Sequence, residues 1–375
     1  MSGEQDRRYM ARAIELAVNG LFTTDPNPRV GCVIVKDDAI VGEGWHQRAG
    51  GPHAEVVALD KAGAGAAGAT AYVTLEPCCH YGRTPPCVDA LIDARVTRVV
   101  IAGLDPNPKV AGKGAEKLTQ AGIAVEHGLL REQAEPLNPG FIKRMRRQLP
   151  YVRCKVAMSL DGRTAMASGE SQWITSELAR QDVQTWRARS SVIMTGIGTV
   201  LADDPSLNVR LSADDDAMAA FTDADQPVRV VLDSRLRMPG DAKMLSLPGT
   251  TLIYTACNIH DHERRVGELE AAGAQVVKVG GDEQTVDLEA VMRDLASREF
   301  NEVMIEAGPA VNGSAISRGL VDELVLYMAP SLMGDDAKGA FHLPGVRSMA
   351  EKIQLDIADT RQIGPDWRII AHPKP

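Results

Sequence analysis

The sequence predicts an α/β protein of two domains. Its 375 residues exceed the roughly 250–300 residues over which a single hydrophobic core usually grows. In both halves short β-rich runs alternate with helical patterns, which indicates sheets covered by helices. Between the halves, residues 130–150 are polar and basic and contain three prolines. We therefore place the boundary there, with domains at 1–147 and 148–375.

The first half predicts a sheet with helices on its faces. Residues 6–19 have the apolar spacing of an amphipathic helix. Two β-rich runs, 30–36 and 39–45, are separated only by Asp37 and Asp38, which indicates a hairpin. Further helices are expected at 55–62, 86–94 and 113–120, and further strands at 70–76, 98–104 and 123–128.

The second half predicts a largely parallel sheet, because its strands alternate with helices. Strands are expected at 151–158, 191–198, 228–234, 251–256, 275–280, 302–308 and 323–330, and helices at 259–272 and 288–297. Residues 214–225 are acidic and rich in alanine, and we expect them to form a mobile loop.

Composition and charge exclude several classes of protein. Charged residues make up 24% of the chain and hydrophobic residues 44%, as in an ordinary soluble globular protein. The net charge of −9 argues against a nucleic-acid partner, and we interpret the short basic run 143–147 as a solvated linker. The sequence has no apolar leader and no membrane-length apolar run, so we expect a cytoplasmic protein. Its six cysteines are then metal ligands or buried thiols rather than disulfides.

A histidine, a glutamate and two cysteines give the strongest chemical signal. His53 and Glu55 open one expected helix, Cys78 follows an expected strand, and Cys87 lies in the first turn of the next helix. One imidazole and two thiolates suit zinc, and three protein ligands leave a fourth position for water. Zinc lowers the pKa of that water, and Glu55 is placed to move protons to a leaving amine. This is the pattern of zinc deaminases, here with eight residues between the cysteines.

Two residues beside this motif offer an alternative. Cys79 adjoins Cys78, and neighbours in an extended chain point to opposite sides, so we do not expect both to bind one ion. His80 would complete a closed Cys₂His₂ structural site and would leave Glu55 without a role. The placement of Glu55 favours the catalytic site.

The second half carries weaker signals for a nucleotide cofactor. Gly196 and Gly198 resemble part of a dinucleotide fingerprint but lack its third glycine. The run 306–314 places a glycine-containing turn between a strand and a helix, where backbone N–H groups can hold phosphate. Ser234 and Arg235 follow another strand, and an arginine there can accept the 2′-phosphate of NADP. Each loop, taken alone, is equally compatible with an ordinary connection.

The chain resembles a known family over its whole length. The motifs that show this resemblance are "NPRVGCVIV", "HAE", "TLEPCCHYGRTPPC", "KVAMSLDGRTAMASGESQWIT", "DVQTWRARS", "GTVLADDPSLNVR" and "IEAGP". They resemble the bifunctional riboflavin-biosynthesis deaminase–reductases. The resemblance implies a cytidine-deaminase-like α/β/α domain followed by a dihydrofolate-reductase-like α/β domain. It also implies one zinc ion per chain and NADPH.

The resemblance further implies the site residues. In the deaminase they are His53, Cys78 and Cys87 on zinc, Glu55 as proton shuttle, and Asn27, His80 and loop 105–114 facing the substrate. In the reductase the NADPH contacts would be Ala157, Trp173, Thr199, Asp203, Ser234, Gly308, Pro309, Ala310, Val311, Asn312, Gly313 and Ser314. Its substrate contacts would be Ser171, Arg187, Leu207, Arg210 and Glu306. Arg187 and Arg210 suit a clamp on the 5′-phosphate, and Lys155, Asp203 and Glu306 are unranked candidates for the acid.

Two consecutive reactions are therefore predicted. The first domain would hydrolyse the 2-amino group of 2,5-diamino-6-ribosylamino-4(3H)-pyrimidinone 5′-phosphate. The second would reduce the ribosyl group to ribityl with NADPH, giving 5-amino-6-ribitylamino-uracil 5′-phosphate. We expect a small-molecule substrate, no nucleic-acid or membrane partner, and a homo-oligomer as the common default.

Two other functions were weighed against these reactions. A nucleic-acid or nucleoside deaminase with an appended nucleotide-binding domain would need basic and aromatic stretches, and aromatic residues are only 4% of this chain. A non-catalytic zinc-containing nucleotide sensor would have a closed metal site, and the change Glu55→Gln would leave its function intact.

Overall fold

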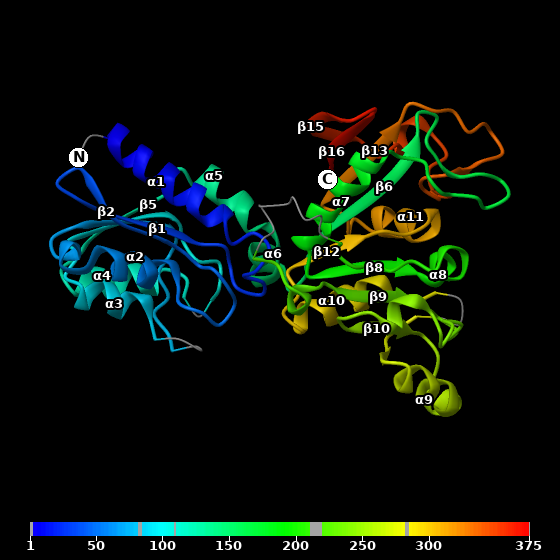
Figure 1. The fold of residues 1–375 in the computed structure, drawn as a ribbon, viewed down its shortest axis with the longest axis horizontal. Helices are drawn as coiled ribbons and strands as arrows, with labels where there is room; N and C mark the ends of the chain where they lie inside the picture. Colours follow the sequence, from blue (N-terminus) through cyan, green and yellow to red (C-terminus); the bar gives the residue numbers. More distant parts are fainter. Residues whose placement is uncertain (1–2, 82–84, 109, 211–219, 282–284, 375) are drawn as a thin grey trace. The chain divides into compact units, whose positions relative to one another are not determined.

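The chain forms two compact units in the computed structural model, and these divide between Gln148 and Leu149. The structure describes residues 3–81, 85–108, 110–210, 220–281 and 285–374 (Figure 1). Of the helices in these ranges, none is both long and apolar enough to cross a membrane. Each unit has its own sheet and its own hydrophobic core.

The first unit is built on a five-stranded sheet with the order β2-β1-β3-β4-β5. Its strands are β1 (Gly31–Lys36), β2 (Ala39–Trp45), β3 (Thr70–Leu75), β4 (Arg98–Gly103) and β5 (Ala124–His127). β1 pairs antiparallel with β2 and β3, whereas β3, β4 and β5 are parallel. Asp37 and Asp38, with φ of 50° and 60°, make the two-residue turn between β1 and β2. The predicted hairpin is confirmed.

Helices cover both faces of this sheet. They are α1 (Gly3–Val18), α2 (Ala54–Ala62), α3 (Cys87–Asp93), α4 (Lys113–Gln120), α5 (Arg131–Ala134) and α6 (Pro139–Arg147). Successive side chains of a strand point to opposite faces. Val33 of β1 therefore lies in one core with Met10 of α1, and its neighbours Cys32 and Ile34 lie in another core with Ala58 of α2. In Figure 1, α1 lies on one side of the sheet and α2, α3 and α4 on the other. The arrangement is the predicted α/β/α sandwich.

The basic run 143–147 is not a solvated linker, contrary to our expectation. Residues 130–148, which include α5 and α6, belong to the first unit. Phe141 is buried, and the Asn138 side chain exchanges two hydrogen bonds of 2.8 Å with the backbone of Arg29. Pro139 is the first residue of α6, a position where a helix needs no N–H, so it starts the helix rather than interrupting it. The basic run 143–147 is the second half of α6, where cations stabilise a helix C-terminus.

The second unit is built on a nine-stranded sheet with the order β11-β10-β9-β8-β12-β6-β13-β16-β15. Its strands are β6 (Tyr151–Ser159), β8 (Val192–Gly196), β9 (Val228–Leu232), β10 (Thr251–Thr255), β11 (Ala274–Lys278), β12 (Glu302–Ile305), β13 (Glu323–Ala329), β15 (Leu355–Ile363) and β16 (Asp366–Pro373). Pairing is parallel from β11 to β13 and antiparallel from β13 to β15. The predicted parallel sheet is therefore present, with an antiparallel edge.

Among the described residues, five α-helices and a small second sheet complete this unit. The helices are α7 (Glu177–Ala188), α8 (Ile197–Asp203), α9 (Glu263–Ala271), α10 (Leu288–Ser297) and α11 (Pro309–Ser317). β7 (Arg163–Ala165) pairs antiparallel with β14 (Lys338–Gly339). We did not predict β15, because most of its side chains are exposed and it lacks apolar alternation. Of the acidic segment 214–225, residues 214–219 lie outside the described residues, and Asp223–Asp225 form a short 3₁₀ turn.

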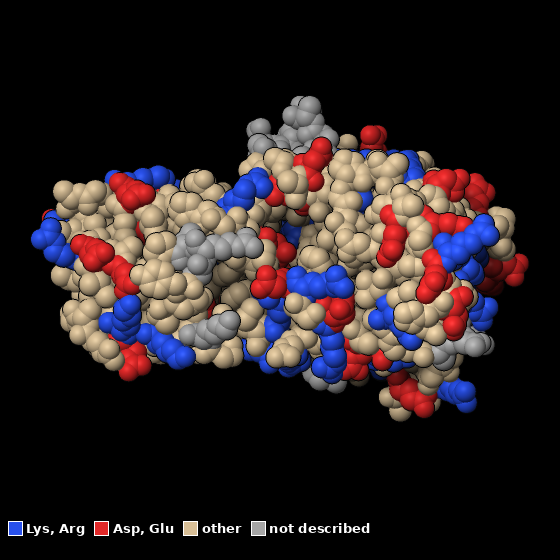
Figure 2. All heavy atoms as spheres, turned by 90° about the horizontal axis from the view of Figure 1, so that it is seen from below, with Lys and Arg blue, Asp and Glu red and all other residues tan. Residues whose placement is uncertain are grey.

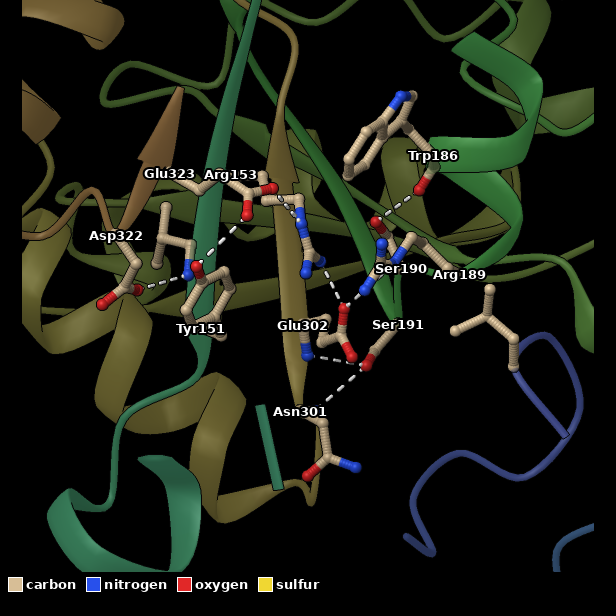
Figure 3. Close-up of polar contacts among 12 residues, drawn as sticks. Tyr151, Arg153, Trp186, Arg189, Ser190, Ser191, Asn301, Glu302, Asp322 and Glu323 are labelled. Atoms are coloured by element: carbon tan, nitrogen blue, oxygen red, sulfur yellow. Dashed lines mark hydrogen bonds and ion pairs between the residues drawn. The ribbon is translucent and has the colours of Figure 1, made fainter. Parts of the chain in front are cut away.

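A buried ion-pair network joins the central strands of this unit at their N-terminal ends (Figure 3). The Arg153 guanidinium on β6 donates to Glu302 on β12 and, over 2.7 Å, to Oε1 of Glu323 on β13. Arg189 Nε lies 3.7 Å from Oε2 of Glu302. The side chains of Arg153 and Glu302 are 2% and 1% exposed. This network holds three neighbouring strands together at the end of the sheet opposite to the one where parallel α/β sheets bind ligands.

Charges of both signs are interspersed on the face drawn in Figure 2. The described Lys and Arg side chains on this face alternate with Asp and Glu and form no continuous basic stripe.

Candidate active sites

Three side chains of the first unit converge as the sequence predicted. His53 Nδ1 lies 3.1 Å from Cys87 Sγ and 3.6 Å from Cys78 Sγ, and the two sulfurs are 3.5 Å apart. Around a tetrahedral zinc ion with ordinary bond lengths, such atoms lie roughly 3.5–3.8 Å apart. The donor set therefore suits zinc, and two of the three separations match this spacing, whereas His53 Nδ1 and Cys87 Sγ lie closer together. Among the described residues this is the one cluster of three or more His, Cys, Asp or Glu side chains compact enough to hold a metal.

Local structure places each of these ligands. His53 is the N-cap of α2, with φ −74° and ψ 162°, and Cys87 is the first residue of α3, preceded by Pro86 as N-cap. The backbone N–H of Cys87 donates to Cys78 Sγ over 3.3 Å. α2 approaches the sheet closely at Gly44, where an added Cβ would lie 2.5 Å from the Ala54 carbonyl oxygen. The two helix starts thus meet at the end of β3.

Electrostatics in the cluster favour a thiolate. The Cys87 thiol and N–H and the nearby His53 lower the pKa of Cys78 to about 4. The hydrogen bond to Cys78, burial and the Glu55 carboxylate raise the pKa of Cys87. Its hydrogen bond with Cys78 raises the pKa of His53. The two thiols share one proton, and a bound cation would replace it.

Glu55 is buried at the start of α2, with 3% of its surface exposed. Burial raises the pKa of its carboxyl group, against the opposing effects of His53 and of a hydrogen bond with the Cys87 thiol. A carboxyl group with a raised pKa beside a metal site can both hold and release a proton near neutral pH.

The two alternative ligands point elsewhere. Cys79 packs against the hydrophobic core beneath α2 and α3, on the opposite side of the chain from Cys78. His80 is exposed and lies outside the compact ligand cluster. The predicted substrate contact of His80 therefore depends on the following loop, of which residues 82–84 lie outside the described residues.

Asn27, a predicted substrate contact, is held beside the metal ligands by a residue that the sequence did not single out. Its Nδ2 lies 3.0 Å from Nε2 of His46, and the His46 ring packs edge-on against the His53 ring at 5.2 Å between centroids. His46 is 2% exposed. A histidine just after a strand gives no motif, which is why we did not predict its role.

The predicted substrate loop 105–114 is organised by a second residue we did not predict. Glu76 is buried and accepts four backbone hydrogen bonds. Its Oε2 accepts from Asp105 (3.1 Å) and Gly112 (2.9 Å), and its Oε1 from Gly114 (2.9 Å) and Ala115 (3.1 Å). These bonds cap the N-terminus of α4 and fix the loop to the end of β3.

A cavity of about 830 Å³ lies in the second unit, at the C-terminal ends of the parallel strands. The predicted site residues that line it are Ala157, Ser171, Trp173, Arg187, Thr199, Asp203, Leu207, Arg210, Glu306, Gly308, Pro309, Ala310 and Val311. Lys155, Arg180, Lys243 and Lys338 add cations that we did not include among the contacts. This volume and this excess of cations fit a dinucleotide carrying several phosphates.

An ion-pair cluster lies at one wall of this cavity. Arg187 donates from Nε to Glu306 Oε1 (2.6 Å), from Nη2 to Glu306 Oε2 (2.9 Å) and from Nη1 to the Asn208 carbonyl (2.9 Å). Lys155 Nζ lies 3.6 Å from Glu306 Oε2. Despite burial, Arg187 and Lys155 lower the pKa of Glu306 to about 2. These bonds use three of the five N–H groups of Arg187, which lines the cavity together with Arg210, so the two-arginine phosphate clamp stays a prediction.

Four predicted cofactor contacts do not line the cavity. Ser234 is buried behind β9. Asn312 Nδ2 donates to the carbonyls of Ala307 (3.0 Å) and Ala340 (3.3 Å). A Cβ on Gly313 would lie 1.9 Å from the His342 carbonyl oxygen. Ser314, one residue further along α11, is likewise not part of the cavity wall. Asn312 and Gly313 hold the segment after β14 against α11, so only residues 308–311 of this turn face the cavity.

Known proteins match both units. Residues 3–103 match the zinc-binding region of cytidine and deoxycytidylate deaminases, and residues 150–369 match the RibD C-terminal domain. The chain belongs to the RibD family. RibD of Escherichia coli K12 is 51% identical over 96% of this chain and 98% of its own length. The chain is therefore a bifunctional deaminase and reductase of riboflavin biosynthesis, as its motifs predicted.

Solved structures agree over the full length. The structure of Acinetobacter baumannii RibD has a TM-score of 0.91 and 47% identity, and the match covers 100% of both chains. A diaminohydroxyphosphoribosylaminopyrimidine deaminase/5-amino-6-(5-phosphoribosylamino)uracil reductase from Thermotoga maritima has a TM-score of 0.84 and 31% identity over 99% of both chains. The order of a deaminase-like and a reductase-like unit is thus shared.

Proposed function

We propose that the first unit hydrolyses the 2-amino group of 2,5-diamino-6-ribosylamino-4(3H)-pyrimidinone 5′-phosphate. We further propose that the second unit reduces the ribosyl group of the product to ribityl with NADPH. The observation that carries the first step is the convergence of His53, Cys78 and Cys87 beside the buried carboxyl group of Glu55.

In the deaminase, His53, Cys78 and Cys87 would hold one zinc ion. Zinc, when bound, supplies a Lewis acid that lowers the pKa of the attacking water toward neutrality. Glu55 takes a proton from that water and gives it to the unprotonated ring nitrogen beside the amino-bearing carbon. It then delivers the second proton to the leaving ammonia. The burial that raises the pKa of Glu55 lets it hold each proton in transit.

In the reductase, Lys155 would supply the proton. NADPH supplies the hydride that goes to C1′ of the open-chain imine, and the imine nitrogen must then gain a proton. Glu306 has a pKa of about 2 and is bound by Arg187, so it stays ionised at neutral pH. Asp203 accepts a hydrogen bond from Ser171 and is exposed. Lys155 lies in the cavity wall, and its burial lowers the pKa of its ammonium, which makes it the better acid of the three candidates.

A crossed assay tests both steps on the same chain. Ammonia release and NADPH oxidation are followed together for wild type, Glu55→Gln and Lys155→Met, with the diamino substrate and with its deaminated product. We expect Glu55→Gln to lose ammonia release by at least about a hundredfold while it still reduces deaminated substrate. Lys155→Met should release ammonia at the wild-type rate and lose NADPH oxidation.

The outcomes separate the two units. A Glu55→Gln variant with normal ammonia release would remove the deaminase assignment. A Lys155→Met variant that still oxidises NADPH at the wild-type rate would leave the reductase without its proposed acid.

A further inference from the structure

The buried side chain of His46 connects two parts of the deaminase site. It follows β2, is 2% exposed, and packs its ring against the ring of His53. Its Nδ1 lies 3.0 Å from the Pro52 carbonyl oxygen, and its Nε2 lies 3.0 Å from Nδ2 of Asn27. His46 thus links the backbone next to the proposed metal ligand His53 to the side chain of Asn27, a predicted substrate contact.

These contacts determine which nitrogen of His46 carries the proton. A carbonyl oxygen can only accept, so Nδ1–H donates to Pro52. An amide nitrogen can only donate as well, so Nε2 of His46 accepts from Nδ2 of Asn27, 3.0 Å away. Asn27 must then turn its NH₂ group toward His46. The amide of Asn27 is fixed in one of its two orientations.

This orientation determines what Asn27 offers to a ligand. Its Oδ1 and its second Nδ2 hydrogen have no partner among the residues that the structure describes. The backbone beneath it is held by a hydrogen bond of 2.7 Å from the Asn27 N–H to the Thr24 carbonyl. An acceptor next to a donor on a fixed backbone complements a lactam edge, in which a ring N–H lies beside a carbonyl.

We propose that His46 is a positioning residue of the deaminase, which orients Asn27 so that its carboxamide reads the lactam edge of an aminopyrimidinone. This inference rests on the proposed function of the first unit. With the N3–H and C4 carbonyl held by Asn27, the unprotonated N1 lies on the other side of the amino-bearing carbon. N1 is then free to take the proton from Glu55.

Two substitutions separate the two hydrogen bonds of His46. The amide of Asn reaches about as far as Nδ1 and that of Gln about as far as Nε2. His46→Asn therefore keeps a donor to Pro52 and loses the acceptor for Asn27, whereas His46→Gln keeps the acceptor and loses the donor. For His46→Asn we expect about a tenfold fall in kcat/KM for ammonia release, mainly as a higher KM, because one neutral hydrogen bond no longer orients Asn27. His46→Gln should lose less than about threefold.

The double variant tests whether His46 acts through Asn27. Asn27→Ala should lower kcat/KM by itself, and adding His46→Asn should lower it no further, because the group that His46 orients is already gone. Zinc content per chain and the rate of reduction of deaminated substrate should equal those of wild type in every variant. His127→Asn, at an exposed histidine of the same unit, is the matched control.

Each other result overturns the proposal. Equal losses in His46→Asn and His46→Gln, or multiplied losses in the double variant, would mean that His46 does not act through Asn27. Loss of zinc from His46→Gln, which lacks the donor to Pro52, would assign His46 to the support of His53 through Pro52. If wild type releases no ammonia from the diamino substrate, the proposed function itself fails, which is a different result from an unaffected His46→Asn.

Discussion

Replacing Glu76 by glutamine should destabilise the first unit and leave the second unchanged. The Glu76 carboxylate accepts two backbone N–H groups on each oxygen, from Asp105, Gly112, Gly114 and Ala115 at 2.9–3.1 Å. A glutamine amide has one acceptor oxygen, and in either orientation its NH₂ group faces two N–H donors. Two hydrogen bonds to a charged group are lost, each contributing about 1.5–3 kcal/mol. Since the loop can relax, we expect a loss near the lower limit, about 3 kcal/mol in the free energy of unfolding.

The reductase activity of the same chain is the internal reference for this measurement. Samples are heated at a series of temperatures, and residual ammonia release and NADPH oxidation are measured separately. For a unit of this size, about 3 kcal/mol corresponds to a midpoint lower by roughly 6–12 °C. Glu126→Gln is the control, because the Glu126 side chain is 61% exposed and its ion pair with Arg98 contributes little. The reasoning is refuted if the deaminase midpoint of Glu76→Gln stays within about 2 °C of wild type, or if both activities fall together.

Two further substitutions test buried charges. Burial raises the pKa of Asp105 from 3.8 to about 6, so the contribution of this group to stability is greatest below about pH 4 and is lower by roughly 3 kcal/mol above pH 6. The Asp105→Asn side chain keeps an acceptor for the Asn107 N–H (2.8 Å) and stays neutral at every pH. In urea unfolding, this variant should be more stable than wild type at pH 7 and equally stable at pH 4. A difference in stability that does not change with pH would contradict burial of the Asp105 charge as the cause. Glu302→Gln removes one of the two carboxylates around the buried Arg153 (Figure 3). The free energy of unfolding of the second unit should fall by about 3 kcal/mol, so the midpoint of heat inactivation of the reductase falls while that of the deaminase stays constant. An unchanged reductase midpoint would show that Glu323 alone neutralises Arg153.

Local patterns in the sequence predicted most of the strands, several of the helices and the residues that we propose as metal ligands. The expected bounds of α4 and α10 match the structure to the residue, because each has apolar periodicity and clear ends. The zinc ligands follow from residue type and from position at helix starts, both of which are local properties. The basic run 143–147 was wrongly interpreted as a solvated linker, since a proline at the start of a helix such as α6 and a proline in a linker look the same without the Asn138–Arg29 contacts.

Tertiary structure alone determined which polar groups meet. His46 pairs with Asn27 across 19 residues, Glu76 with loop 105–115 across 29 to 39, and Arg187 with Glu306 across 119. The last pair keeps Glu306 ionised, which supports our proposal of Lys155 as the acid among the three candidates. Periodicity and spacing describe neighbours within a few residues, whereas a hydrogen bond between distant segments depends on how strands are ordered in the sheet. The sequence by itself thus determined the fold class and the family and predicted the metal ligands, and the packed sheets decided which polar side chains meet at the proposed sites.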